Sequence, residues 1–259
     1  MQIAKNFCNI LKILMISWLL LPSCVEKTVD PNDPAAAFAK AREAYDDEMF
    51  EMAVTKLGEF KSRFPYSKHA PEAELMVAHA HFQLGHYSEA ASAYEQFIKM
   101  HPRHEKAEFA QFRVGEAYWA EAPDAIDREQ DYTLKAIVEW EKLVSNYPKS
   151  ENLKKAQDLL GQGRRRVAEH SNFIAQFYCK QEIYHACAYR NLELIEQFPQ
   201  FKDLTKIAYL KAALAFEKLA KIKAADEQSD SNIYFKTMSS TELQQKSIAL
   251  KTKAETVLP

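Results

Sequence analysis

Glycine is scarce in this sequence, with five glycines among 259 residues. A fold of short strands joined by tight turns places glycine at many turn positions, so this scarcity argues against a strand-and-turn architecture. Alanine, leucine, lysine, glutamate and glutamine are plentiful instead, and all five favour helix. We therefore expect an all-α fold.

An excess of charge of either sign is also missing. Lysine and arginine number 34 and aspartate and glutamate 36, for a formal net charge of −2. Such a balance gives no basic field to draw the chain onto nucleic acid, so nucleic acid is not an expected partner. The 47% of hydrophobic residues excludes a wholly disordered chain.

The N-terminus carries an apolar run, residues 13–21, that is too short to span a bilayer and follows Lys5 and Lys12. This pattern is typical of a secretory signal peptide, which we place at residues 1–23. The sequence Leu21-Pro22-Ser23-Cys24 resembles a bacterial lipobox, although proline is atypical at its position. The resemblance implies that Cys24 is acylated and becomes the first mature residue, followed by a tether over 24–33; a chance cysteine after an ordinary signal peptide is the alternative.

Val25 follows Cys24. In many proteobacterial lipoproteins an aspartate at this position means retention in the inner membrane, so its absence favours the outer membrane. Several acyl chains anchor a protein stably, whereas one chain binds a membrane only marginally. The expected location is the periplasmic side of the outer membrane, with the chain held by its lipid.

Cysteine is too rare for a disulfide framework. Four cysteines are present; Cys8 lies in the signal peptide and Cys24 at the lipidation site, which leaves Cys179 and Cys187 for the folded body. The export compartment is oxidising and permits a bridge between them. We nevertheless expect two small buried thiols on facing helices.

The folded body begins at Asp33 and Pro34, a helix cap followed by proline at the first helical position. Beyond it, four marks end amphipathic segments: Phe64-Pro65, His101-Pro102, Tyr147-Pro148 and Phe198-Pro199. Counting back twelve residues from each proline reaches a small residue every time: Ala53, Ala90, Ala136 and Cys187. The shared register resembles the tetratricopeptide (TPR) repeat of about 34 residues, in which helical hairpins bury one another's apolar faces.

The second copy matches the TPR pattern best, at Ala78, Gly85, Tyr87, Ala90, Tyr94 and Pro102. The third copy has an exposed loop over 122–131, and a long first helix over 153–178 opens the fourth. A fifth copy over 206–221 lacks a closing proline and is interpreted as a cap. We therefore predict an α-solenoid of about five hairpins, with an N-terminal TPR pair over 34–104 and C-terminal TPRs over 105–228. The tail, 229–259, offers a capping box at Ser239 and Glu242, and both a terminal helix and disorder stay open.

The order of these irregularities, together with the lipobox, resembles the BamD family, the TPR lipoproteins of the outer-membrane β-barrel assembly machinery. The most similar stretches are residues 64–67, 97–102 and 142–148. The resemblance implies a scaffold without catalysis or cofactor, whose 34–104 half receives the C-termini of unfolded outer-membrane proteins. Its 105–228 half would dock on the periplasmic repeat domains of the barrel-forming subunit, with accessory lipoproteins as further partners. The divergent tail, shorter third loop and weak fifth copy depart from the family pattern.

In TPR folds the first helix of each hairpin lines the concave face. That phase selects nine residues, most of them aromatic: Phe38, Arg42, Tyr45, Leu75, His79, Phe82, Phe109, Phe112 and Trp119. We predict that five of these bind an extended peptide ending in an aromatic residue: Phe38, Arg42, Tyr45, His79 and Phe82. Packing between repeats is the alternative, and it is at least as good for Phe109 and Phe112.

Two arginine features remain. Arg190 matches the position of a family arginine that pairs with an acidic residue of the barrel subunit, so it is our candidate for partner docking; a solvent-facing charge is the alternative. The run 164–166 is three consecutive arginines, which point in different directions on a helix. A solvated face and contact with anionic lipid are both open for this run.

Signatures of catalysis are missing. His104 and Glu105 begin like a zinc-protease helix, but Glu108 stands where the second histidine is required, and we expect no metal site. No phosphate loop, Gly-x-Ser-x-Gly elbow or paired-cysteine motif is present. The competing function is that of another periplasmic TPR lipoprotein, such as a cell-wall or division coordinator or a pilus-secretin assembly factor. A hydrolase would need a nucleophile and a base brought together by the fold.

Overall fold

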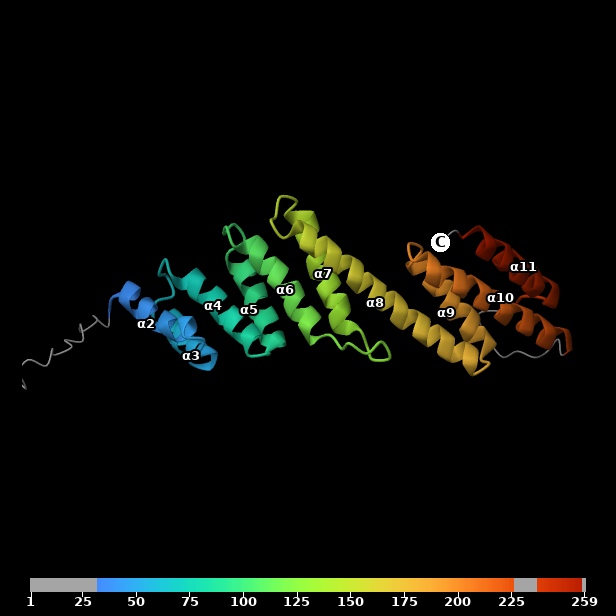
Figure 1. Ribbon diagram of the computed structural model, residues 1–259, viewed down its shortest axis with the longest axis horizontal. Coiled ribbons are helices and arrows are strands. Elements are labelled where there is room, and N and C mark those ends of the chain that lie inside the picture. Colours follow the sequence, from blue (N-terminus) through green and yellow to red (C-terminus); the bar gives the residue numbers. More distant parts are fainter. Residues whose placement is uncertain (1–31, 226–236, 258–259) are drawn as a thin grey trace, which may run out of the picture.

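The computed structural model describes residues 32–225 and 237–257, which fold into helices with no strand among them (Figure 1). The signal peptide and Cys24 lie outside the described residues. The helices, in chain order, are α2 (Pro34–Asp46), α3 (Phe50–Arg63), α4 (Ala70–Gln83), α5 (Tyr87–Met100), α6 (Ala107–Glu121), α7 (Asp131–Asn146), α8 (Leu153–Lys180), α9 (Tyr184–Gln197), α10 (Lys202–Ala225) and α11 (Ser240–Thr256). The predicted all-α class is confirmed.

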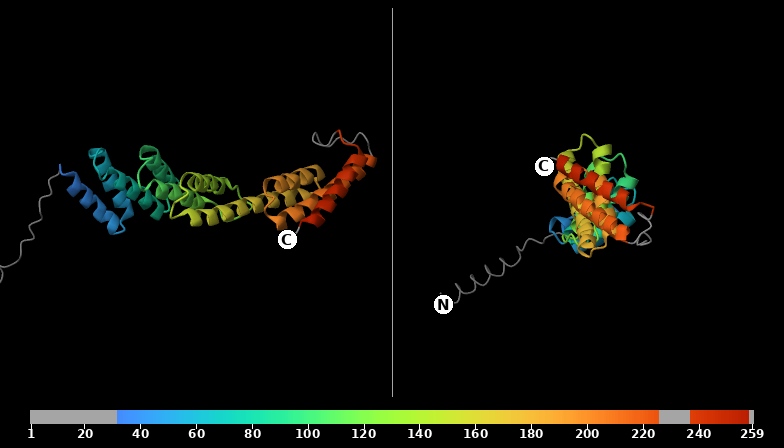
Figure 2. Two further views of the ribbon diagram at one scale, coloured as in Figure 1. Left: turned by 90° about the horizontal axis from the view of Figure 1, so that it is seen from above. Right: turned by 90° about the vertical axis from the view of Figure 1, so that its right-hand side faces the viewer.

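The helices form a row of antiparallel hairpins, in which each helix packs mainly on the one before and the one after it. The row is elongated, as the two perpendicular views show (Figure 2). The 28-residue helix α8 runs from the hairpin of α6 and α7 to the hairpin that it forms with α9. This arrangement is the predicted TPR solenoid, including the over-long helix that opens the fourth repeat.

Small side chains at the shared register positions explain how the helices approach closely. Ala53, Ala90 and Ala136 are fully buried, and Cys187 is nearly so. Large rings fill the space between hairpins, among them the fully buried Tyr94. Burial of such side chains contributes about 1.5–3 kcal/mol each, so the row is stabilised hairpin by hairpin.

Helix ends follow the sequence marks. Helices α3, α5, α7 and α9 each stop two residues before a proline, which cannot continue a helix. The turn inside three hairpins repeats a left-handed residue two positions before the second helix: Glu48 (φ 57°), Gly85 (φ 76°) and Glu182 (φ 59°). Glycine adopts this conformation freely, while the two glutamates carry a steric cost there.

The last hairpin was only partly predicted. Helix α11 packs along α10 and completes a fifth pair, although no proline closes α10. The capping box is present, with the Ser239 hydroxyl accepting from the Glu242 N–H and the Glu242 carboxylate accepting from the Ser239 N–H. Ser247 donates to the Ala213 carbonyl at 2.8 Å, which ties the two helices together.

The two cysteines of the folded body form a disulfide, which corrects our expectation of free thiols. Cys179 near the end of α8 bonds to Cys187 in α9. The two residues lie on facing helices, as expected. They are close to the turn that joins α8 to α9, where two cysteines come near enough to bond. Asn191 donates its side-chain N–H to the Cys187 carbonyl at 2.8 Å and supports the same turn.

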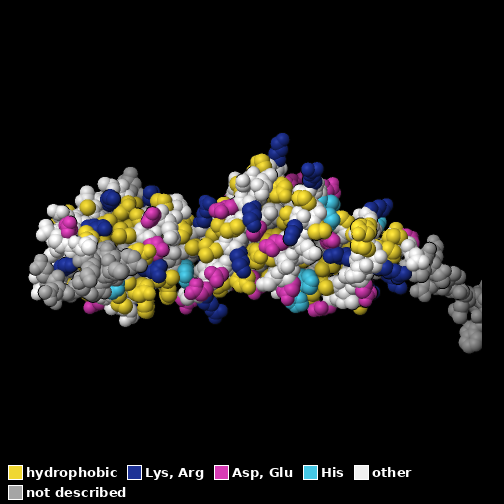
Figure 3. Space-filling view, turned by 180° about the vertical axis from the view of Figure 1, so that it is seen from behind, with side chains coloured by type: hydrophobic (Ala, Val, Ile, Leu, Met, Phe, Trp, Pro, Cys, Tyr) yellow, Lys and Arg dark blue, Asp and Glu magenta, His cyan; other side chains and the backbone are white. Residues whose placement is uncertain are grey.

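The face of the molecule seen in Figure 3 carries both signs of charge. Lysine and arginine side chains alternate with aspartate and glutamate along the face seen in Figure 3, with hydrophobic side chains between them. No helix within residues 32–225 and 237–257 is long and apolar enough to cross a membrane.

Candidate polypeptide-binding surfaces

Phe38 does not belong to the exposed concave face where the sequence placed it. Its ring is 5% exposed, stacks on His69 with centroids 4.8 Å apart, and meets Phe60 at 5.4 Å. The side chain is part of the core between α2, α3 and α4. Phe38 therefore packs between repeats, which was the alternative to peptide binding, and its ring is not available to a peptide.

Tyr45 and His79 form the centre of the N-terminal surface. The Tyr45 hydroxyl bonds to His79 Nδ1, and the Gln83 amide donates to His79 Nε2 at 2.9 Å. A ring whose Nε2 accepts carries its proton on Nδ1, so Nδ1 donates to Tyr45. Burial lowers the pKa of His79, and the positive charge of Arg113 lowers it further. His79 is thus held neutral, with its tautomer fixed.

Phe50 closes one side of this centre. Its ring meets Tyr45 edge-on at 5.9 Å and His79 at 6.4 Å. Burial is also the largest cause of the raised pKa of Tyr45. The aromatic groups from α2, α3 and α4 therefore fix one another before any ligand arrives.

Arg113, in α6, is a residue that the sequence analysis missed. Its guanidinium lies 4.1 Å from the centroid of the Phe82 ring and donates to Glu116 at 2.7 Å. A weaker bond reaches the Tyr94 hydroxyl at 3.4 Å, and Nη2 is buried without a hydrogen-bond partner. A desolvated cation with a free donor beside aromatic rings suits a carboxylate or a carbonyl oxygen.

The missed signal was the helical phase. Position 113 lies one turn before the buried Ala117 on α6. On this helix the aromatic residues Phe109, Phe112 and Trp119 were selected from the sequence, and Arg113 was not. Phe112 is buried in the core, as the packing alternative had it, and Phe109 is 39% exposed. A cation among aromatics was the better clue on this helix.

Arg42 is exposed and already paired. It bonds to Asp46 at 3.2 Å on its own helix and to Glu72 of α4 at 3.1 Å. Exposed pairs of this kind contribute little to stability and exchange easily, so Arg42 is available at the edge of the surface rather than at its centre. We call Tyr45, His79, Phe82 and Arg113 the N-terminal surface, which extends beyond the predicted 34–104 half because Arg113 belongs to α6.

The C-terminal half has a different character. Arg190, in α9, is 43% exposed and pairs with Glu193 at 2.9 Å, one turn along the helix. Apolar side chains are exposed on α8 and α10, at helical spacing on each: Phe173, Phe177, Ile207, Leu210 and Leu214. A cavity of about 410 Å³ lies between these helices and α9, with Lys180, Lys211 and Leu214 in its wall.

No group of three His, Cys, Asp or Glu side chains within residues 32–225 and 237–257 is placed to hold a metal ion. Three groups of the N-terminal surface have shifted pKa values, namely Tyr45, His79 and Arg113; Tyr45 bonds to His79, and the charge of Arg113 acts on both. They are arranged to present rings and one cation.

Comparison with known proteins gives the following. A family model described as an outer membrane lipoprotein, YfiO, matches residues 30–231. The outer membrane protein assembly factor BamD of Vibrio cholerae is 24% identical over 203 residues, which are 75% of this chain and 84% of that protein. The BamD of Neisseria meningitidis serogroup A is 25% identical over 198 residues, 73% of each chain. Among solved structures, the TPR2AB-domain:pHSP90 complex of yeast Sti1 overlaps 86% of this chain and 83% of its own, at 15% identity and a TM-score of 0.42.

Proposed function

Because this chain belongs to the YfiO family of outer membrane lipoproteins, we propose that it is a non-catalytic scaffold of the outer-membrane β-barrel assembly machinery. Its place is the outer membrane, where its family resides. In the proposed role, residues 34–104 receive unfolded outer-membrane proteins and residues 105–228 dock on the periplasmic domains of the barrel-forming subunit. Accessory lipoproteins are further proposed partners.

The N-terminal surface carries this proposal. Tyr45, Phe82 and His79 offer ring faces, while Arg113 offers a buried donor without a partner. An extended peptide ending in an aromatic residue would stack its ring on them and place its terminal carboxylate or a backbone carbonyl at Arg113. The cost of ordering the receptor is small, because the rings already hold one another.

A peptide titration tests the proposal. A fluorescent peptide copied from the last strand of an outer-membrane protein should bind, and Tyr45→Ala, Phe82→Ala and Arg113→Gln should each weaken it about tenfold, near 1.4 kcal/mol. Tyr66→Ala is the matched control, since Tyr66 lies in the same half and is fully exposed. Unchanged binding by the three variants, with helical circular dichroism retained, would remove the N-terminal surface from the proposal.

The docking half rests on Arg190 and the apolar side chains of α8 and α10. An exposed arginine beside unpartnered apolar groups resembles the composition of protein interfaces, where arginine is a frequent hot spot. Arg190→Glu should abolish recovery of the barrel-forming subunit from solubilised envelope, while Lys149→Glu, an exposed charge reversal outside α8–α10, should not. Recovery of a secretin or a peptidoglycan synthase in place of a barrel protein would favour the competing class of TPR lipoprotein.

Cys24 is the proposed anchor. Mass spectrometry of the mature protein should find the mass of acyl chains on an N-terminal Cys24, and Cys24→Ala should release the protein from membranes. A mature N-terminus without acyl groups would contradict this part of the proposal.

A further inference from the structure

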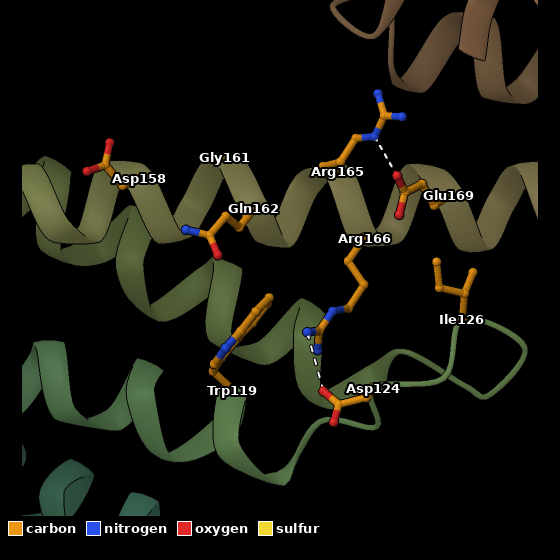
Figure 4. Close-up of a pocket in the computed structure, with 9 residues that line it drawn as sticks. All are labelled: Trp119, Asp124, Ile126, Asp158, Gly161, Gln162, Arg165, Arg166 and Glu169. Carbon is orange, nitrogen blue, oxygen red and sulfur yellow. Dashed lines mark hydrogen bonds and ion pairs between the residues drawn. The ribbon is translucent and has the colours of Figure 1, made fainter. Parts of the chain in front are cut away.

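The loop between α6 and α7 is held against α8. The ring N–H of His170, at Nδ1, donates to the Ile126 carbonyl at 2.6 Å. Between the loop and the helix lies a pocket of about 580 Å³, with Trp119, Asp124 and Arg166 in its wall (Figure 4). The exposed loop and the run of arginines, separate features of the sequence, thus meet at this pocket.

Arg166 enters the pocket with most of its side chain out of water. Its guanidinium lies 3.9 Å from the centroid of the Trp119 ring, and its side chain is 20% exposed. Its nearest acid, Asp124, is 3.7 Å away and fully exposed, while Arg166 Nη1 is buried without a hydrogen-bond partner. The desolvated Arg166 guanidinium therefore has one distant partner and one unused donor. Leaving that donor without a hydrogen bond costs free energy, which a ligand that accepts from it would recover.

The neighbouring arginines differ. Arg165 also lines the pocket, but its guanidinium lies on the side of α8 opposite to Trp119 in Figure 4 and makes two bonds to Asp203 at 2.7 and 2.8 Å. Arg164 bonds to Glu141 at 2.7 Å. Of the three, only Arg166 is left with a buried, unused donor, so the pocket singles it out.

We propose that this pocket binds an aspartate or glutamate side chain of the docked partner, with Arg166 as its cation and Asp124 as the resident competitor that it displaces. The inference rests on the proposed function, since it takes the periplasmic domains of the barrel-forming subunit as that partner. The incoming carboxylate would form the paired, fork-like bond that Asp124 does not make.

The exchange leaves the charge of the pocket unchanged. One carboxylate enters as that of Asp124 leaves Arg166, and the release costs little because the Asp124 side chain is already fully exposed. Asp158 and Glu169 also line the pocket, so a phosphate with more negative charge would meet two further carboxylates. The loop is bonded to α8 at Ile126 and to itself at Ala125 and Arg128, so Asp124 can leave while the loop stays.

Titration of the mature full-length protein with the purified periplasmic domains of the barrel-forming subunit tests the inference. Arg166→Gln should weaken binding at least about tenfold, whereas Asp124→Asn should strengthen it about threefold. When Arg166→Gln is also present, Asp124→Asn should no longer strengthen binding, because Asp124 and the partner's carboxylate then have no guanidinium to compete for. Asp127→Asn removes the same charge from the same loop and should leave binding unchanged.

The outcomes separate cleanly. If the unaltered protein fails to bind the domains, the proposed partner is wrong and the pocket loses its occupant with it. If the unaltered protein binds but Asp124→Asn does not tighten binding, or tightens it equally with Arg166→Gln present, the inference alone is wrong. Sedimentation with phosphatidylglycerol vesicles that depends on Arg166 would assign the pocket to lipid and overturn the inference too.

Discussion

The two halves of the solenoid share one scaffold but expose different chemistry on the first helices of their hairpins. In α2, α4 and α6 those helices present Tyr45, His79, Phe82 and Arg113; Tyr45 bonds to His79, and the Arg113 guanidinium lies over the Phe82 ring. In α8 and α10 they present unpartnered apolar side chains, among them Phe173 and Leu210. Both halves bury alanines at matching positions, so the difference lies in surface residues that packing does not determine.

In the proposed function, this contrast lets one repeat fold serve two binding tasks. The buried register tolerates little change because small residues set the distance between helices. Exposed positions are free to vary, so each hairpin acquires its own recognition surface without altering the row.

The largest effect should come from Gly115, between the two halves. A Cβ at this position would overlap the indole of Trp140, which is fully buried. Gly115→Leu should therefore lower the free energy of unfolding by about 3 kcal/mol or more. Urea unfolding followed by circular dichroism measures it.

Gly161→Ala is the matched control. Position 161 lies within α8 and a Cβ there meets nothing within 4 Å. Alanine should stabilise the helix by about 0.5–1 kcal/mol relative to glycine. Equal destabilisation by both substitutions would show that the overlap with Trp140 is not the cause, since helix propensity favours both replacements over glycine.

The disulfide should stabilise the C-terminal half alone. A cross-link closing a loop of this length removes about 2–3 kcal/mol of chain entropy from the unfolded state. The double substitution Cys179→Ala with Cys187→Ala should therefore increase hydrogen exchange in α9, while α2 to α5 keep their protection. Loss of protection along the entire row would mean that the hairpins unfold as one unit.

The caps at the two ends of the row should differ in strength. Asp33 accepts one bond, from Ala35, whereas Ser239 and Glu242 cap reciprocally. Ser239→Ala should cost about 1 kcal/mol and Asp33→Ala somewhat less. Thermal unfolding of the two variants side by side compares them, and a larger loss from Asp33→Ala would reverse the ranking.

The smallest effect should be the pH dependence from His79. Burial lowers its pKa, so its contribution to stability is present above the ordinary value of about 6.5 and is lost as the pH falls from there toward the lowered pKa. In the His79→Gln variant the free energy of unfolding should fall less between pH 7.5 and 5.5. The difference should be only a few tenths of a kcal/mol, because the site is partly exposed to solvent. Urea midpoints across this range measure it, and an unchanged slope would argue against a neutral buried His79.

Much of the fold could be predicted from the sequence, because proline and small residues act locally. Ala53 and Ala90 are buried where the register put them, and α3 and α5 stop before their prolines. Pairing of α11 with α10 was missed because no proline marks the end of α10. Helical phase alone could not separate a buried ring such as Phe38 from an exposed one, since the depth of burial depends on the neighbouring hairpin.

The site was predicted less completely for a physical reason. Arg113 and Arg166 are proposed binding residues because side chains of other helices desolvate them and leave one donor of each unpaired. Neither condition can be predicted from the neighbouring residues in the sequence. Likewise, Cys179 and Cys187 were expected as thiols because their separation across a turn depends on the angle between α8 and α9.

The most direct measurement titrates the same protein with two probes, the strand peptide and the periplasmic domains of the barrel-forming subunit. Tyr45→Ala with Phe82→Ala should lose the peptide and keep the domains, while Arg190→Glu should lose the domains and keep the peptide. A variant that loses both probes while remaining folded, or either variant losing neither, would contradict the claim that the two halves carry separate recognition surfaces.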